Sequence, residues 1–159
     1  MKTKLSTIVI FIICINAFTF AQCKFEVNEL DKFTKSINIV TKMEILHKDF
    51  NSAISFNFCK SDSSLFIKVG LNLTGKVYSI DKGDKLMIIC SDSIITLNSS
   101  EYKLVSGFTY INYFISQKQF EIIQTMNITD IRIYLIDSFI DKKIELKRAE
   151  KILELSKCI

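Results

Sequence analysis

Apolar and polar residues alternate in strand-length runs along the middle of the chain. Between residues 53 and 98, short polar segments rich in Gly, Asp and Ser separate the apolar runs. Runs of this length with turn residues between them are typical of antiparallel strands joined by tight turns. We therefore predict a meander of five strands: residues 53–59, 64–73, 76–80, 85–90 and 94–98.

The same alternation predicts which side chains are buried. In the first two strands it places Ile54, Phe56, Phe58, Leu65, Ile67, Val69, Leu71 and Leu73 on the inner face. Further period-two runs predict strands at residues 34–46, 102–105, 108–115 and 128–135. In the last of these, Ile131, Ile133 and Leu135 point inward, whereas Asp130, Arg132 and Tyr134 point outward.

Two segments have the period of a helix instead. Ser116 and Gln119 have the spacing of a capping box, which predicts a short helix over residues 117–126. A second helix is predicted from a cap at Asp141 to Lys157. Its apolar face consists of Ala149, Ile152, Leu153, Ser156 and Ile159. The predicted fold class is α+β: a mostly antiparallel meander sheet, one short helix, and a C-terminal amphipathic helix packed on the sheet.

The first 21 residues have the features of a signal peptide. Lys2 and Lys4 precede an apolar run, and Thr19 and Ala21 supply acceptable residues for a signal peptidase. We expect cleavage after Ala21, so that residues 22–159 form one globular domain. A retained transmembrane anchor is disfavoured because the apolar run is short. Lipid attachment at Cys23 is disfavoured because Gln22, not a small residue, precedes it.

The charge of the chain argues against a nucleic-acid partner. The full chain has 21 basic and 17 acidic residues, a net charge of +4. Loss of Lys2 and Lys4 with the leader leaves 19 basic residues against 17 acidic ones, a net charge of +2. A nucleic-acid-binding protein needs a concentrated basic face, which this balance does not indicate. We also expect no membrane span after cleavage.

Four cysteines remain after cleavage: Cys23, Cys59, Cys90 and Cys158. An even number in an exported chain favours disulfides. A meander would place the ends of strands 53–59 and 85–90 at opposite edges of the sheet, so pairing of Cys59 with Cys90 is disfavoured. We predict the pairs Cys23–Cys59 and Cys90–Cys158, with Cys23–Cys90 and Cys59–Cys158 as the alternative. No CxxC occurs and His47 is the only histidine, so we expect no metal site and no cofactor.

Arg132 is the one candidate for ligand binding that the sequence singles out. It is one of two arginines in a chain that otherwise uses lysine, and a guanidinium pairs with a carboxylate through two parallel hydrogen bonds. One interpretation is an internal ion pair with Glu29, Asp31 or Glu44. The other is recognition of a carboxylate or phosphate on a ligand.

The other candidate residues have simpler interpretations. His47 is predicted to be a solvated turn residue, since no nucleophile is indicated near it. Glu29 and Asp31 offer too few ligands for calcium and are expected to stay on the surface or to cap the following segment. Five aromatic residues either line a pocket or pack across strands: Tyr102, Phe108, Tyr110, Tyr113 and Phe114.

Two short motifs carry a resemblance. Residues 28–34 read Asn-Glu-Leu-Asp-Lys-Phe-Thr, and residues 131–133 read Ile-Arg-Ile before a terminal helix that ends near Cys158. The chain resembles small exported proteins of Bacteroidota-type bacteria in these two motifs. The resemblance implies export across an inner membrane and supplies no activity.

These features predict a class of protein but no specific reaction. The leading hypothesis is a non-enzymatic exported protein that binds a protein partner or a small ligand in the periplasm or envelope. The first alternative is a small secreted hydrolase or lyase with an unrecognised site. The second is an inhibitor or immunity-type protein that offers a sheet edge to a secreted partner.

Overall fold

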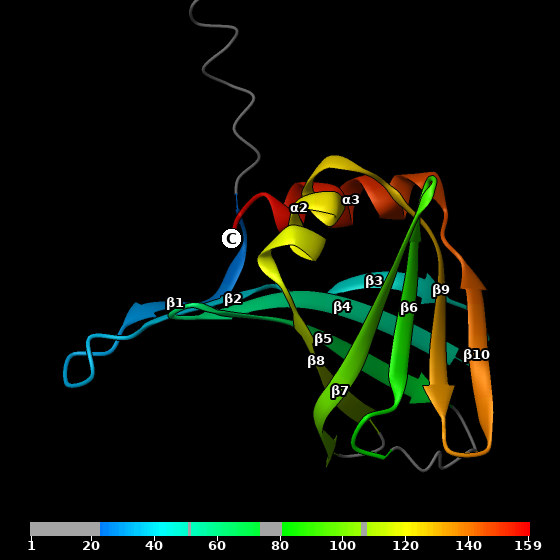
Figure 1. Cartoon of the computed structure of the whole chain (residues 1–159), viewed down its shortest axis with the longest axis horizontal. Coiled ribbons are helices and arrows are strands. Elements are labelled where there is room, and N and C mark those ends of the chain that lie inside the picture. The colour runs from blue at the N-terminus through cyan, green and yellow to red at the C-terminus, as the bar shows by residue number, and fades with distance from the viewer. Residues whose placement is uncertain (1–22, 51, 74–80, 106–107) are drawn as a thin grey trace, which may run out of the picture.

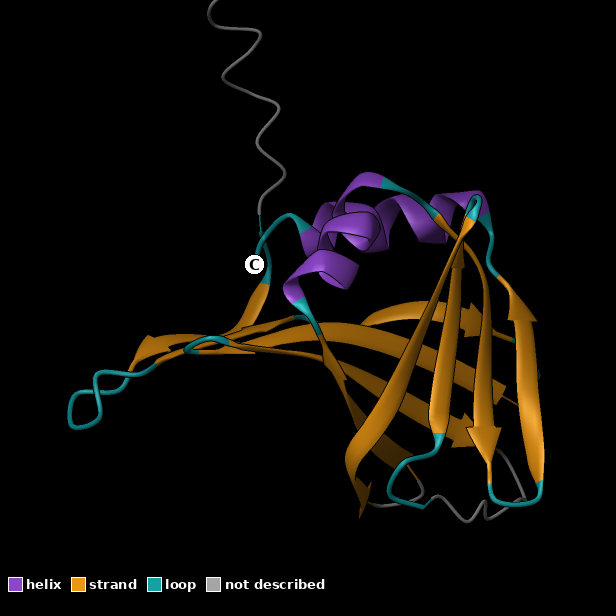
Figure 2. Cartoon of the chain, in the orientation of Figure 1, coloured by secondary structure: helices purple, strands orange, loops and turns teal. Residues whose placement is uncertain are grey.

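The computed structural model describes residues 23–50, 52–73, 81–105 and 108–159, without the side chains of Leu73 and Val105. These residues form ten strands and two helices (Figures 1 and 2). In chain order the elements are β1 Phe25–Leu30, β2 Ile37–Thr41, β3 Glu44–Lys48, β4 Ser52–Ser61, β5 Ser64–Leu73, β6 Lys85–Cys90, β7 Ser93–Val105, β8 Phe108–Ile115, α2 Gln117–Thr125, β9 Ile128–Leu135, β10 Ser138–Lys143 and α3 Leu146–Ser156.

All strand pairs are antiparallel, in the order β1-β2-β4-β5-β8-β7-β6-β9-β10, with β3 also paired to β4. The long strand β7 pairs with β6 through its first half and with β8 through its second. We call β1–β5, β8 and the second half of β7 the larger half of the sheet, and the remainder the smaller half. The simple meander was wrong, because β5 pairs with β8 and β6 pairs with β9.

The core lies between the two halves and the helices. Strands of the smaller half run across the direction of those in the larger half, and the helices lie over the side between them (Figure 1). Helix α3 contacts β3, β4 and β9 as well as α2. The ring of Phe120 on α2 meets that of Phe58 on β4 edge to face, with centroids 5.3 Å apart. One continuous cluster of buried residues therefore joins both halves.

Several sequence predictions are confirmed. The bounds predicted for β5, β6 and β9 and for the strand at residues 108–115 match the structure. The inner-face residues predicted in β4 and β5 are buried, apart from Leu73, whose side chain is not described. The capping box is present: the Ser116 N–H donates to Gln119 Oε1 at 3.1 Å and the Gln119 N–H donates to Ser116 Oγ. The predicted strand at residues 76–80 and the predicted leader lie outside the described residues.

The C-terminal helix is shorter than predicted. It begins at Leu146, and Asp141 is not its cap but a member of strand β10. Residues of β10 return beside β9 after a tight turn, and Asp141 lies opposite Arg132. On α3, Leu155 is buried and Leu153 is only half-buried, so the apolar face is rotated slightly from the predicted one.

The strand predicted over residues 34–46 is two strands. The segments β2 and β3 both pair with β4, and the chain between them leaves the sheet. The Thr41 hydroxyl replaces the lost ladder contacts, since it accepts from the Phe58 N–H at 2.9 Å and donates to the Phe58 carbonyl at 3.3 Å. Residues Asn28 to Leu30 belong to β1.

The predicted set of disulfides and its alternative were both wrong. Cys23 is bonded to Cys158, with Cα atoms 5.6 Å apart, and Cys59 and Cys90 are free thiols. The end of α3 lies beside the start of β1 and the end of β4, where Lys60 Nζ donates to the Ile159 main-chain oxygen at 3.3 Å. The two terminal cysteines therefore meet each other and not a strand cysteine. Burial raises the pKa of the Cys59 thiol and raises that of the Cys90 thiol to about 11, which disfavours the reactive thiolate at neutral pH.

Candidate functional site

An open groove of about 820 Å³ lies on the larger half of the sheet, on the face opposite the core. It is lined by side chains from neighbouring strands of the sheet, of which β5 and β8 are far apart in the sequence. One row of partners crosses it: Ile45 on β3, Ser55 on β4, Gly70 on β5, Tyr110 on β8 and Lys103 on β7. On the two central strands the neighbours of Ser55 and Gly70 face the core: Ile54, Phe56, Val69 and Leu71 are buried.

The groove is hollow because small residues occupy its middle. Ala53, Ser55 and Gly70 lie on the two central strands, and larger side chains rise from the strands on either side. At Gly70 the backbone is closely covered: a Cβ there would lie 2.6 Å from Ser55 Oγ, 3.2 Å from Met43 Sδ and 3.3 Å from a ring carbon of Tyr110. Any larger residue at position 70 would displace part of the lining.

Aromatic side chains form one wall of the groove. Tyr102 and Phe108 are 54% and 40% exposed. The rings of Phe108 and Tyr110 are nearly parallel, with centroids 6.2 Å apart and planes inclined by 15°. Together these rings offer a solvent-facing apolar surface at a concave place, the combination that small-molecule sites use.

Charged and amide groups surround the aromatic wall. The groove is lined by three lysines, Lys48, Lys68 and Lys103, and by the carboxylates of Glu26 and Glu101. The Glu101 carboxylate already accepts a hydrogen bond from Asn112 Nδ2 at 2.7 Å. The lining therefore has more basic than acidic side chains, and one of its two carboxylates, that of Glu101, already accepts a hydrogen bond from within the protein.

The predicted aromatic cluster is divided between three places. Tyr102, Phe108 and Tyr110 line the groove, so the pocket interpretation is correct for these three. Tyr113 lies in the core with no exposed surface, and burial raises the pKa of its phenol. Its hydroxyl has no hydrogen-bond partner among the described residues. Phe114 lies outside the groove and packs edge to face on Phe66, with centroids 5.6 Å apart.

Arg132 forms the internal ion pair, but with a partner that the sequence did not indicate. Its Nε and Nη2 donate to the two carboxylate oxygens of Asp141, each at 2.6 Å, and the guanidinium lies 4.5 Å from the ring centroid of Phe139. Asp141 raises the pKa of Arg132, and Arg132 lowers that of Asp141. Pairing with Glu29, Asp31 or Glu44 was wrong. Arg132 lines a smaller recess of about 380 Å³. There its Nε and Nη2 donors are already used by the Asp141 carboxylate.

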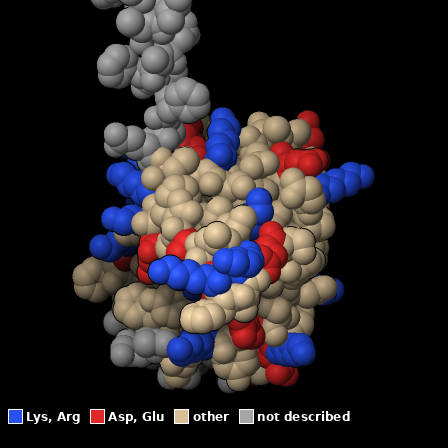
Figure 3. All heavy atoms as spheres, turned by 90° about the vertical axis from the view of Figure 1, so that its left-hand side faces the viewer, with Lys and Arg blue, Asp and Glu red and all other residues tan. Residues whose placement is uncertain are grey.

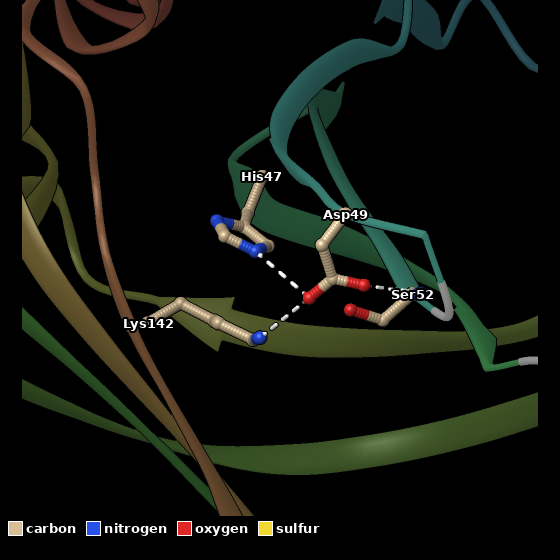
Figure 4. Close-up of polar contacts among 4 residues, drawn as sticks. All are labelled: His47, Asp49, Ser52 and Lys142. Carbon is tan, nitrogen blue, oxygen red and sulfur yellow. Dashed lines mark hydrogen bonds and ion pairs between the residues drawn. The ribbon is translucent and has the colours of Figure 1, made fainter.

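His47 lies in β3, not in the predicted turn, and belongs to a polar cluster between two sheet edges (Figure 4). Oδ2 of Asp49 lies 3.3 Å from His47 Nε2 and accepts from Lys142 Nζ at 2.9 Å. Its Oδ1 accepts from the main-chain N–H of Ser52 at 2.7 Å. The cluster thus connects β10 to the β3–β4 region.

Within this cluster, the Ser52 side chain is not arranged as an activated nucleophile. Its hydroxyl is buried and has no hydrogen-bond partner in the part of the chain that the structure describes. A catalytic serine needs its hydroxyl within hydrogen-bond reach of a base. The contacts of Asp49 instead hold two edges of the sheet together. Among the described residues, no group of three or more His, Cys, Asp or Glu side chains is placed to hold a metal ion.

The sequence matches no protein-family model, no curated protein and no solved structure. The resemblance to exported Bacteroidota-type proteins therefore stays a prediction. Among the described residues, no helix is both long and apolar enough to cross a membrane.

Proposed function

We propose that this protein is a non-enzymatic exported binding protein of a bacterial periplasm or envelope, and that the groove on the larger half of the sheet holds its ligand. The observation that carries the proposal is the position of Tyr102, Phe108 and Tyr110, which are held at a concave surface while remaining open to solvent. Exposed aromatic rings at a recess are a common basis of recognition, because they supply apolar contact at small cost in side-chain entropy.

The lining indicates the chemistry of the ligand. A flat apolar part would lie against the aromatic wall, and an anionic group would lie near Lys48, Lys68 and Lys103. Asn72 and Asn112 add donors and acceptors that fix orientation. The proposed ligand class is therefore an amphipathic molecule with a planar apolar body and at least one anionic substituent.

Two further features support export. The leader at residues 1–21 has the charge, apolar run and small-residue exit of a signal peptide. The bond between Cys23 and Cys158 belongs to the kind of covalent structure that persists in oxidising compartments.

Binding at the groove is tested with the fluorescent probe 1-anilinonaphthalene-8-sulfonate, which has a flat apolar body and a sulfonate. We expect saturable binding to the intact mature protein and at least roughly tenfold weaker binding to Phe108→Ser, because one wall of the groove is removed. Phe114→Ser is the matched control, since Phe114 lies on the same strand and the same sheet face but outside the groove. Equal losses for the two variants would refute the assignment of the groove.

The contribution of charge is tested separately. Lys103→Gln is expected to weaken binding of the sulfonate probe several-fold and to reduce its dependence on salt. Lys118→Gln, an exposed position on α2, is the control. Unchanged binding in Lys103→Gln would contradict the proposed anionic class of ligand, while leaving the aromatic wall as the site.

Export is tested by the mass of the protein recovered from the native host. We expect a chain that begins at Gln22. Retention of Met1, or a diacylglycerol group on Cys23, would contradict the proposed export and cleavage.

A further inference from the structure

Lys68 differs from the other two lysines of the groove in its position. It lies on β5, one of the two central strands, and its side chain is half-buried, whereas Lys48 on β3 and Lys103 on β7 are exposed. An exposed ammonium is hydrated and screened by salt, so it attracts an anion only weakly. A half-buried ammonium in a recess is less screened, and its attraction for an anion is stronger there.

Lys68 also makes no ion pair and no hydrogen bond with any residue that the structure describes. Charged side chains elsewhere are used within the fold. Oδ1 of Asp31, for example, accepts hydrogen bonds from the N–H groups of Phe33 at 2.8 Å and Thr34 at 2.9 Å, which confirms the capping role considered for Asp31. A half-buried charge without a partner has lost hydration with no compensation, and an anion in the groove would supply it.

The two carboxylates of the groove do not neutralise Lys68. Glu101 lies opposite Asn112, which lies opposite Lys68, so the two charged residues are two strand spacings apart, about 10 Å. The Glu101 carboxylate accepts from Asn112 Nδ2 at 2.7 Å. Glu26 lies on β1, which β2 and β4 separate from β5. Among the described residues, neither carboxylate forms an ion pair with Lys68.

The charge of the molecule as a whole does not select a site for an anion. Figure 3 shows basic and acidic side chains interspersed over the face from which the β1–β2 hairpin projects, with no large area of one sign. A mixed surface of this kind produces no strong long-range field. The affinity for an anion therefore depends on the local surroundings of single basic groups.

We propose that Lys68 binds the anionic group of the ligand directly, and that Lys48 and Lys103 contribute only through longer-range attraction. This inference rests on the proposed function of the groove. Lys68 is two residues from Gly70 along β5, about 7 Å of strand, and Gly70 lies opposite Tyr110 of the aromatic wall. The ligand class is therefore narrowed to aromatic acids whose carboxylate or sulfonate is attached to the ring system directly or through a short connection.

The test compares 1-anilinonaphthalene-8-sulfonate with N-phenyl-1-naphthylamine, a neutral probe that has the same rings and no sulfonate. Lys68→Gln in the mature protein should lower the ratio of the two affinities at least roughly tenfold, because a charge-assisted contact is lost. Binding of the neutral probe should stay within about twofold of the native value. Lys48→Gln and Lys103→Gln are the matched controls: each should lower the ratio only several-fold, and this effect should disappear at high salt.

The thiol of Cys59 gives a second measurement that needs no substitution of Lys68. Burial raises the pKa of this thiol, and the Lys68 ammonium partly offsets that rise. An anion bound at Lys68 cancels the offset, so saturation with the sulfonate probe should slow alkylation of Cys59 by iodoacetamide at least roughly twofold. The neutral probe controls for shielding by the bound rings and should leave the rate nearly unchanged.

An equal fall in the affinity ratio for Lys68→Gln and Lys103→Gln would overturn the assignment of Lys68, as would equal slowing of Cys59 alkylation by the two probes. In either case, loss of neutral-probe binding in Phe108→Ser but not in Phe114→Ser would still support the groove as the site. Absence of saturable binding by the native protein would instead refute the proposed function, and this inference with it.

Discussion

Removal of the bond between Cys23 and Cys158 tests how the chain ends are held. The bond joins residues 135 positions apart. In the chain-entropy description, a cross-link over that separation removes about 17 cal/mol/K from the unfolded state, or about 5 kcal/mol at room temperature. This value is an upper bound on the destabilisation of the doubly substituted chain Cys23→Ser/Cys158→Ser.

The position of the bond lowers the expected value. Cys23 is exposed and precedes β1, an edge strand whose residues are mostly exposed, and Cys158 follows the last turn of α3. Local fraying at either end releases the constraint without unfolding the core. We therefore expect a loss of about 2–4 kcal/mol in the free energy of unfolding, within the range usual for native disulfides.

The measurement is urea unfolding of the oxidised native chain and of Cys23→Ser/Cys158→Ser, followed by circular dichroism. Cys59→Ser is the control for loss of a thiol, because Cys59 is unpaired and half-buried. Peptide mapping without reductant, with free thiols blocked in acid, should yield one linked peptide containing Cys23 and Cys158. A linked peptide containing Cys59 or Cys90, or equal stability of the double variant and the native chain, would refute the reasoning.

Three further predictions concern the core, the groove and an exposed ion pair. Ile152 is fully buried on α3, so Ile152→Asp should cost several kcal/mol by urea unfolding, whereas Lys151→Asp on the exposed side should cost about 0.5 kcal/mol; equal values would show that α3 is not docked. Gly70→Ala should destabilise the chain by about 1–3 kcal/mol and weaken probe binding, because its Cβ would lie 2.6 Å from a side-chain oxygen of the neighbouring strand; an unchanged melting temperature and affinity would contradict the close packing at the groove. Arg132 lowers the pKa of Asp141 in the folded chain below its unfolded value, so the stabilisation from this pair is present at neutral pH and is lost as the pH falls through the folded pKa; an NMR titration of Asp141 in which Arg132→Gln leaves its pKa unchanged would argue against the pair.

The sequence predicts local structure well where one face of one element decides it. Ile67, Val69 and Leu71 alternate with polar or small residues, and burial of one face follows directly from that pattern. The capping box of α2 likewise depends only on Ser116 and Gln119, two residues three positions apart. Such features require no knowledge of what lies opposite.

Pairing between distant segments could not be predicted in the same way. The sequence predicted Asp141 as the cap of a helix, and only the pairing of residues 138–143 with β9 makes this segment a strand. The disulfide prediction failed because it assumed that all four cysteines are paired. Once the meander excluded Cys59–Cys90, each of these two was assigned to a terminal cysteine, whereas both are free and Cys23 bonds to Cys158. Strand order depends on contacts far apart in the sequence, and period alone does not encode it.

The groove illustrates the same limit for function. Its aromatic residues were recognised as a cluster, but alternation could not separate Tyr113 in the core from Tyr110 in the groove until the sheet face was known. Gly70 and Ser55 gave no signal at all, since their importance lies in being small beside larger residues on neighbouring strands. A large-small-large pattern across a sheet becomes visible only when the strand order is established.

Strand β7 has a consequence for how this molecule transmits mechanical load. Its residues 93–98 are hydrogen-bonded to β6, and residues from Ser99 onward are bonded to β8, with an irregularity between Ser99 and Glu101. The backbone of β7 therefore runs without interruption from the smaller half of the sheet to the groove wall that carries Tyr102 and Lys103. A tilt of β6, β9 and β10 would be passed to that wall through the peptide chain itself, in addition to the shared core and the contact between Lys142 and Asp49 that also join the two halves.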